Sequence, residues 1–129
     1  MISLAIGQGE LGMTPLQMAN MTAAIANRGT YYTPHIIKEI RSGEAIDPSL
    51  LEKHETSIDS SHYEVAVEGM ELVVNGGEGS TARIAKMPDI TICGKTGTAQ
   101  NPFGEDHSIF VAFAPKDDPQ IAIAVYVEN

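Results

Sequence analysis

A short stretch of small and polar residues around one lysine offers the most specific chemistry in the sequence. Residues 90–100 read ITICGKTGTAQ, which begins with the alternation of a β-strand and continues as Gly94-Lys95-Thr96-Gly97-Thr98. Glycine within a strand leaves room for another backbone or a ligand to come close. On a strand, Lys95 and Gly97 point to one side, and Thr96 and Thr98 point to the other. One fixed positive charge and two hydroxyls therefore predict a site that holds a carboxylate against a strand edge.

The string Gly94-Lys95-Thr96 also matches the end of a phosphate-binding P-loop. That motif requires a further glycine five places before Gly94, where this sequence has Asp89. It also requires a helix directly afterwards, whose N-terminal amides bind the phosphate. Gly97 and Pro102 follow instead. We therefore reject nucleotide binding.

Residues 95–100 (KTGTAQ) resemble the third motif, Lys-Thr-Gly, of penicillin-binding proteins and serine β-lactamases. The longer string is similar to that of the class B penicillin-binding transpeptidases, in particular the elongation type (the penicillin-binding protein 2 group). Residues 3–27 resemble the segment that leads into a buried helix in this family. Residues 107–115 and 121–129 resemble its two strands after the motif. The similarity covers most of the chain and is weakest in residues 41–60.

The other two motifs of this family, Ser-x-x-Lys and Ser-x-Asn, precede Lys-Thr-Gly in chain order. None of the eight serines has a lysine three places on or an asparagine two places on. We therefore expect residues 1–129 to be the C-terminal part of a transpeptidase domain. The nucleophilic serine and its general base would lie outside this chain, which alone would have no turnover.

The resemblance implies a role for each residue of the motif. In the family, a serine attacks the D-Ala-D-Ala amide of a peptidoglycan stem peptide and forms an acyl-enzyme, a step that β-lactams mimic. Lys95 would supply positive charge and assist proton transfer, and the hydroxyls of Thr96 and Thr98 would bind the terminal carboxylate. Gly97 would let the substrate lie as an added strand. The backbone N–H of Thr98 would be one of two oxyanion-hole donors.

The resemblance also implies partners and a location. The ligands would be peptidoglycan stem peptides and β-lactams, and the protein partner would be a glycan-polymerising enzyme. The domain would lie outside the cytoplasm, in the periplasm, on an inner-membrane anchor. No cofactor is expected. Two alternatives remain open: a penicillin-recognising sensor or β-lactamase of the same fold, and a non-catalytic module that offers a strand edge to peptides. The coding sequence upstream would discriminate the enzyme from the non-catalytic module, because only the enzyme needs the two serine motifs there.

Composition excludes several other classes of function. The chain has 129 residues, 43% of them hydrophobic, and a net charge of −9, which argues against nucleic-acid binding. Its single cysteine, Cys93, excludes an internal disulfide and a cysteine-rich metal site, and we expect a buried thiol. Neither His35 nor His54 has a second histidine at metal-binding spacing, so no metal site is predicted. The sequence contains no candidate membrane span or signal peptide.

Two helices are predicted from capping signals and periodicity. Thr14-Pro15-Leu16-Gln17 is a capping box that begins a helix running to about Arg28, apolar nearly all round and partly uncovered over residues 16–25. Ser61 is predicted to cap a second helix that Asn75 and the following glycines end. One face of this helix is apolar, formed by Tyr63, Val67, Met70 and Val74. Residues 81–86 are predicted to add a helical turn.

The remaining pattern predicts strands and therefore an α+β fold. Residues 90–100, 108–114 and 121–127 form a three-strand antiparallel meander, in which the last strand is apolar on both faces and belongs in the middle of a covered sheet. If its natural neighbour is missing, its edge invites dimerisation or strand swapping. Weaker signals predict a short strand at 2–12 leading into a loop, a turn at 29–34, a strand at 36–40 and a surface excursion at 41–60.

Overall fold

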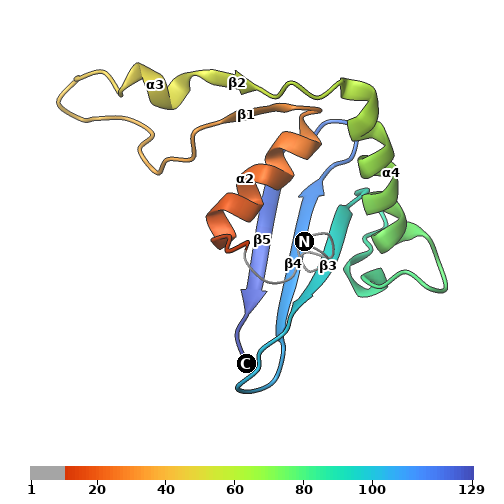
Figure 1. The fold of residues 1–129 in the computed structure, drawn as a ribbon. Coiled ribbons are helices and arrows are strands. Elements are labelled where there is room, and N and C mark those ends of the chain that lie inside the picture. Colours follow the sequence, from red (N-terminus) through yellow and green to blue (C-terminus); the bar gives the residue numbers. More distant parts are fainter. Residues whose placement is uncertain (1–10) are drawn as a thin grey trace.

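The computed structural model describes residues 11–129, so the strand expected within residues 2–12 lies almost wholly outside the described residues. The elements, in chain order, are α2 (Pro15–Ala26), β1 (Thr30–Tyr32), α3 (Pro48–Leu51), β2 (Lys53–Glu55), α4 (Ser60–Asn75), the 3-10 helix η1 (Arg83–Ala85), β3 (Cys93–Ala99), β4 (His107–Ala114) and β5 (Ile121–Val127). The last three strands form an antiparallel sheet in the order β3-β4-β5. The predicted α+β class, with two main helices and a three-strand meander, is confirmed (Figure 1).

Helix α2 begins as its sequence predicts. The Thr14 hydroxyl accepts a hydrogen bond from the Gln17 amide at 3.3 Å, and the Gln17 side chain accepts from the Thr14 amide at 2.8 Å. The helix ends at Ala26, slightly before the predicted Arg28. Arg28 has a left-handed φ of 54°, and Gly29 follows with a φ of 107°. Because this conformation cannot continue a right-handed helix, the chain turns there into β1.

Both helices pack on the same face of the sheet (Figure 1). Helix α2 lies against β5 and β4, and α4 lies along β3. The core between them consists of Ala26, Val67, Met70, Cys93 and Phe113. The predicted apolar face of α4 is confirmed, since all four of its residues are buried. Burying this stripe is what fixes α4 against the strand that carries Lys95.

The predicted cap of α4 is wrong. The helix begins at Ser60, and Asp59 is its N-cap: the Asp59 carboxylate accepts from the Ser61 amide at 2.9 Å and from the Ser61 hydroxyl at 2.6 Å. The Ser61 hydroxyl acts as a donor, so it does not cap the helix itself. These two bonds, that of the hydroxyl first, lower the pKa of Asp59. The end of the helix at Asn75 is as predicted, and the Asn75 side chain donates to the Ile92 carbonyl at 2.9 Å.

Residues 29–56 differ from the prediction. The strand lies at Thr30–Tyr32, inside the segment predicted as a turn, and it pairs antiparallel with Lys53–Glu55 in the segment predicted as an irregular excursion. Residues 34–40 contain no strand, and Ile36 is fully exposed. Pro34, two residues after the end of β1, has no backbone donor, so the ladder cannot continue to the isoleucines. Ala114-Pro115, which is cis, ends β4 as predicted.

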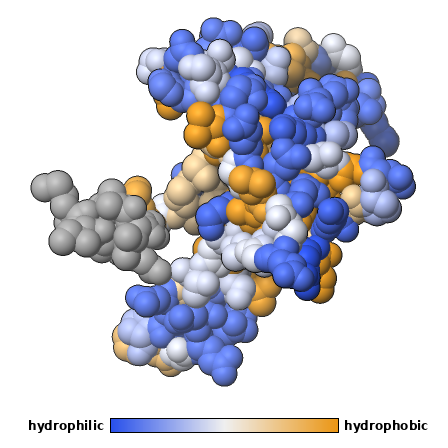
Figure 2. Space-filling model, turned by 90° about the vertical axis from the view of Figure 1, so that its right-hand side faces the viewer, coloured by the Kyte–Doolittle hydropathy of each residue, from blue (hydrophilic) through white to orange (hydrophobic). Residues whose placement is uncertain are grey.

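Within residues 11–129, strand β5 lies at the edge of the sheet, as expected if its natural neighbour is missing, but the expected cover on both of its faces is wrong there. Helix α2 covers the face that carries Ala122. The opposite face is exposed, with Ile121 at 60% and Val125 at 46%. Leu16 and Met21 of α2 are also exposed, as predicted. Seen from the side where α4 lies, the surface is mostly hydrophilic with separate hydrophobic patches (Figure 2).

One ion pair joins the end of α2 to α4, and another joins α4 to the turn between β4 and β5. Arg28 Nε lies 2.8 Å from Glu64 Oε1 and Arg28 Nη2 lies 3.3 Å from Glu64 Oε2, while Nη1 donates to the carbonyls of Ala26 and Lys116. Lys116 Nζ lies 2.6 Å from Glu71 Oε2. The hydrogen bond from Arg28 is the main reason that the pKa of Glu64 is lowered. Arg28 therefore ties the end of α2 to the start of α4.

We expect the Arg28–Glu64 pair to make stability depend on pH in the acid range. Because the pKa of Glu64 is lower in the folded chain, its contribution is present above the ordinary carboxyl pKa of about 4.3 and is lost as pH falls through the folded pKa. Glu64→Gln should therefore lower the melting temperature at pH 7 more than at pH 3. Glu68→Gln, at an exposed position of the same helix, is the matched control. An equal loss at both pH values would contradict this.

Candidate active site

The predicted carboxylate-binding residues lie on β3, an edge strand. Its register pairs Lys95 with Val111, Thr96 with Phe110 and Thr98 with Ser108 of β4. Within residues 11–129, β4 is the only strand beside β3, so the opposite edge of β3 has no strand neighbour. A strand edge of this kind is where an extended peptide can add as a further strand.

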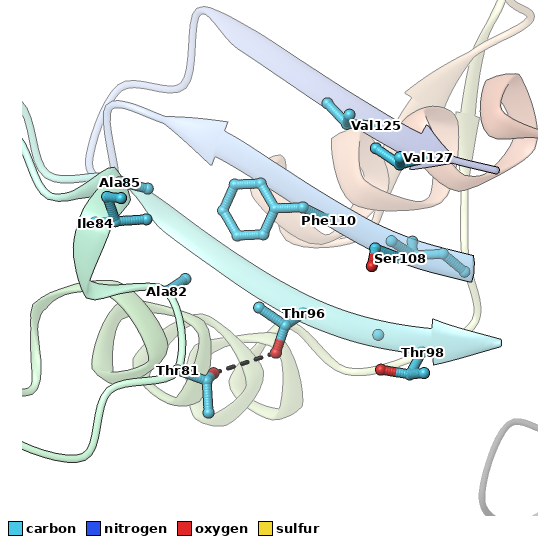
Figure 3. A pocket seen from close by; sticks show the side chains of 12 residues that line it. Thr81, Ala82, Ile84, Ala85, Thr96, Thr98, Ser108, Phe110, Val125 and Val127 are labelled. Carbon is cyan, nitrogen blue, oxygen red and sulfur yellow. Dashed lines mark hydrogen bonds between the residues drawn. The ribbon is translucent and has the colours of Figure 1, made fainter. Parts of the chain in front are cut away.

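The side chains of β3 alternate as predicted. Thr96 and Thr98 line the same cavity as Phe110 of β4 and Val125 of β5, on the sheet face away from the two helices (Figure 3). Lys95 is on the opposite parity and is exposed, with its Nζ donating to the Thr96 carbonyl at 2.6 Å. The strand therefore presents a lysine on one side and two threonines on the other, with Gly97 between them.

The cavity beside the threonines has a volume of about 360 Å³. Its floor comes from the three strands, and its rim comes from residues 81–85, which include η1. Thr81 Oγ1 lies 3.1 Å from Thr96 Oγ1, and Figure 3 shows the Thr96 hydroxyl turned away from β4 toward Thr81. Sequence reasoning missed Thr81, because the prediction of a helical turn there gave no sign that its hydroxyl would reach the motif.

The two glycines of the motif differ in how much space surrounds them. A Cβ on Gly94 would lie 2.7 and 2.8 Å from ring atoms of Phe110 and 3.2 Å from the Val111 carbonyl oxygen, so the Phe110 ring would have to move. A Cβ on Gly97 would come no closer than 3.5 Å to Ile109, which is an ordinary contact. Neither glycine has a positive φ. Packing within the described chain therefore disfavours a side chain at position 94 but leaves room at position 97.

Cys93 is fully buried directly before the motif, as predicted. Burial, and after it the negative charge of Glu71, raise the pKa of its thiol to about 11 against the opposing charge of Lys116. A thiol with this pKa is protonated near neutral pH, so it is not a nucleophile.

The histidines have structural contacts. His54 stacks on Tyr31 with ring centroids 5.1 Å apart, and its Nε2 lies 3.2 Å from Thr33 Oγ1. His35 Nδ1 lies 3.0 Å from the Thr33 carbonyl oxygen. Among residues 11–129, no group of three or more histidine, cysteine or acidic side chains is arranged to hold a metal ion. No helix in that range is long and apolar enough to cross a membrane.

The whole chain, residues 1–129, matches the family model described as penicillin binding protein transpeptidase domain. The chain belongs to this family. Among its relatives, peptidoglycan D,D-transpeptidase MrdA of Haemophilus influenzae is 34% identical over 145 residues, which cover 99% of this chain and 22% of the relative. Peptidoglycan D,D-transpeptidase PbpA of Mycobacterium tuberculosis is 33% identical over 131 residues, covering 97% of this chain and 26% of the relative.

Solved structures of penicillin-binding proteins share the fold. Pseudomonas aeruginosa PBP2, solved with WCK 5153, superposes with a TM-score of 0.80 at 40% identity, covering 98% of this chain and 27% of that one. Helicobacter pylori PBP2, solved with MreC, gives a TM-score of 0.78 at 31% identity, covering 98% of this chain and 22% of that one. The recognition of the family and of its fold from the sequence is confirmed. The roles of Lys95, Thr96, Gly97 and Thr98 stay predictions.

We expect the two glycines to respond differently to alanine. Gly94→Ala should destabilise the chain by about 1–3 kcal/mol, because the Phe110 ring or the strand must move. Gly97→Ala, the matched control, should leave stability unchanged or slightly raised, because alanine loses less backbone entropy on folding. Thermal unfolding followed by circular dichroism measures both. Equal melting temperatures for the two variants would show that the Gly94–Phe110 contact does not constrain the sheet.

Proposed function

We propose that this chain forms the Lys-Thr-Gly wall of the active site in a D,D-transpeptidase that cross-links peptidoglycan stem peptides. The observation that carries the proposal is the position of Lys95, Thr96, Gly97 and Thr98 on a strand whose outer edge has no strand neighbour within residues 11–129. The family match and the relatives named D,D-transpeptidases support it. The chain spans about a quarter or less of those relatives, so the activity belongs to a longer protein.

In this proposal the substrate's D-Ala-D-Ala end binds along the outer edge of β3. Its terminal carboxylate accepts hydrogen bonds from the hydroxyls of Thr96 and Thr98, and Lys95 adds positive charge near the strand. Gly97 supports this arrangement, because the space beside it is not taken up by the chain's own packing. A side chain at position 97 would occupy the space in which the substrate backbone approaches the strand.

The chemical step is acyl transfer. A serine outside residues 1–129 attacks the amide carbonyl, and the backbone N–H of Thr98 is one of two donors that stabilise the oxyanion of the tetrahedral intermediate. The terminal D-alanine leaves, and the amine of a second stem peptide then takes the acyl group from the serine. Lys95 assists proton transfer around the serine of the Ser-x-Asn motif, which also lies outside this chain. Residues 1–129 alone would therefore bind but not turn over.

The proposal extends to partners and location. The longer protein acts on peptidoglycan outside the cytoplasm, in the periplasm on an inner-membrane anchor, and works with a glycan-polymerising enzyme. β-Lactams bind at the same strand because the carboxylate and the ring amide of the β-lactam imitate the D-Ala-D-Ala end. The solved complex of Helicobacter pylori PBP2 with MreC is an assembly of that relative and supports a multi-protein setting for this one.

Covalent labelling by a penicillin tests the proposed function. We expect intact-mass analysis to find one adduct on the complete domain, in which this chain is joined to the segment that carries the serine. The 129-residue chain should gain none, because no serine in it has a lysine three places on. Stoichiometric labelling of the short chain would place the nucleophile within it. If neither form labels, a non-catalytic peptide-binding module becomes the better account.

We also propose that the isolated chain dimerises through β5. Seven residues without a charge or a proline, IAIAVYV, form this edge strand. Natural edge strands usually carry a charged residue or a proline, which prevents pairing with another chain. A second copy aligned antiparallel along β5 would extend the sheet across both molecules and place the exposed faces with Ile121 and Val125 side by side on one continuous surface.

A single lysine should prevent this dimer. Val125→Lys places a charge on the exposed face of β5, where two copies would bring their lysines close together. Val65→Lys makes the same change on α4, where the valine is 70% exposed, and is the matched control. Sedimentation velocity over a hundredfold concentration range should show a dimer for the native chain and Val65→Lys, and a monomer for Val125→Lys. A native chain that stays monomeric throughout would refute β5 pairing.

A further inference from the structure

Thr81 lies outside β3, and its side chain is hydrogen-bonded to the Thr96 hydroxyl of the proposed carboxylate site. Its Oγ1 lies 3.1 Å from Thr96 Oγ1. The two residues are 15 positions apart and come from different elements, since Thr81 precedes η1 and Thr96 lies within β3. The fold therefore brings the Thr81 hydroxyl to the proposed carboxylate site.

The backbone around Thr81 is held in place on both sides. Ser80 donates through its hydroxyl to the Leu72 carbonyl at 2.8 Å, and the Ala82 amide donates to the Val73 carbonyl at 3.0 Å. Ala82 is buried, with 5% of its surface exposed. These contacts attach residues 80–82 to the last turn of α4. The Asn75 side chain attaches the same turn to the Ile92 carbonyl just before β3.

The direction of the hydrogen bond decides what Thr81 does. A threonine hydroxyl has a single proton to donate. If the Thr96 hydroxyl donated its proton to Thr81, the Thr96 oxygen could only accept a further hydrogen bond. The Thr96 oxygen and an incoming carboxylate oxygen would then both be acceptors and could not bond to each other. If Thr81 donates to Thr96, the Thr96 proton is free to point at the carboxylate. The productive arrangement is therefore a chain from Thr81 through Thr96 to the bound anion, in which each hydrogen bond strengthens the next.

We propose that Thr81 is a positioning residue for the substrate carboxylate, donating to Thr96 Oγ1 so that the Thr96 hydroxyl donates to the ligand. This inference rests on the proposed function, because it assigns a role to the hydroxyl of the same site. The pair is exposed to water in the free chain. A ligand lying along β3 excludes that water, which makes the orientation of the Thr96 proton matter more once the ligand is bound.

Acylation of the complete domain by a penicillin and by its methyl ester tests the inference. Thr81→Val keeps the shape of the side chain and removes its proton. We expect it to lower the second-order acylation constant about three- to tenfold for the free acid, the effect of one hydrogen bond, and less than about twofold for the uncharged ester. Thr81→Ser keeps the hydroxyl and should stay within about twofold of the native domain for both ligands.

The matched control is Thr33→Val, which also removes a threonine hydroxyl that contacts a side chain, His54 Nε2 at 3.2 Å, on the separate β1–β2 ladder. It should change neither rate. Thr81 is exposed, so the melting temperature of each variant should stay close to that of the native domain.

Three outcomes would overturn the inference while leaving the proposed function intact. The first is native rates for Thr81→Val with both ligands. The second is an equal loss for the acid and the ester, which a purely structural role would produce. The third is a loss in Thr81→Ser as large as that in Thr81→Val, which would assign the effect to the methyl group. A native domain that no penicillin acylates would instead overturn the proposed function, and this inference with it.

Discussion

The packing of α2 and α4 onto one face of the sheet is the constraint from which the rest of the structure follows. Phe113 of β4 and Cys93 of β3 are buried beneath the helices together with Val67 of α4. Strand alternation then sends every second side chain of β3 to the opposite face, where Thr96 and Thr98 line the cavity. Helix α4 also anchors the segment that carries Thr81. The side-chain arrangement at the motif is thus a consequence of the core.

Local signals in the sequence were sufficient wherever neighbours along the chain determine the outcome. The capping box at Thr14, the apolar face of α4 and the alternation of the last strands each depend on spacings of a few residues, and the structure has all of them. That Thr96 and Thr98 share one side of the strand, opposite to Lys95, also follows from alternation alone. Lys-Thr-Gly identified the family only together with its longer string and the flanking segments, residues 3–27, 107–115 and 121–129, and the family match confirms that recognition.

The predictions from the sequence were wrong or incomplete where two neighbouring residues could each cap a helix, and where two paired segments lie far apart along the chain. Asp59 and Ser61 both offer a helix cap, and the carboxylate accepted bonds that Ser61 donates. The pairing of β1 with β2 crosses a long irregular segment, which no periodicity within either strand reveals. The contact between Thr81 and Thr96 depends on how α4 packs against the sheet, so the sequence alone does not predict it.

The anchoring of residues 75–96 at both ends bears on how this region can vary in related sequences. The Asn75–Ile92 bond attaches the helix end to the strand, and the Thr81–Thr96 contact closes the same segment farther along β3. An insertion or deletion in residues 76–80 would move Thr81 relative to the end of α4 and so away from Thr96, while a length change in residues 34–47 would leave β3 untouched. We therefore expect homologous chains to differ in length mainly in the second region and to vary by substitution in the first.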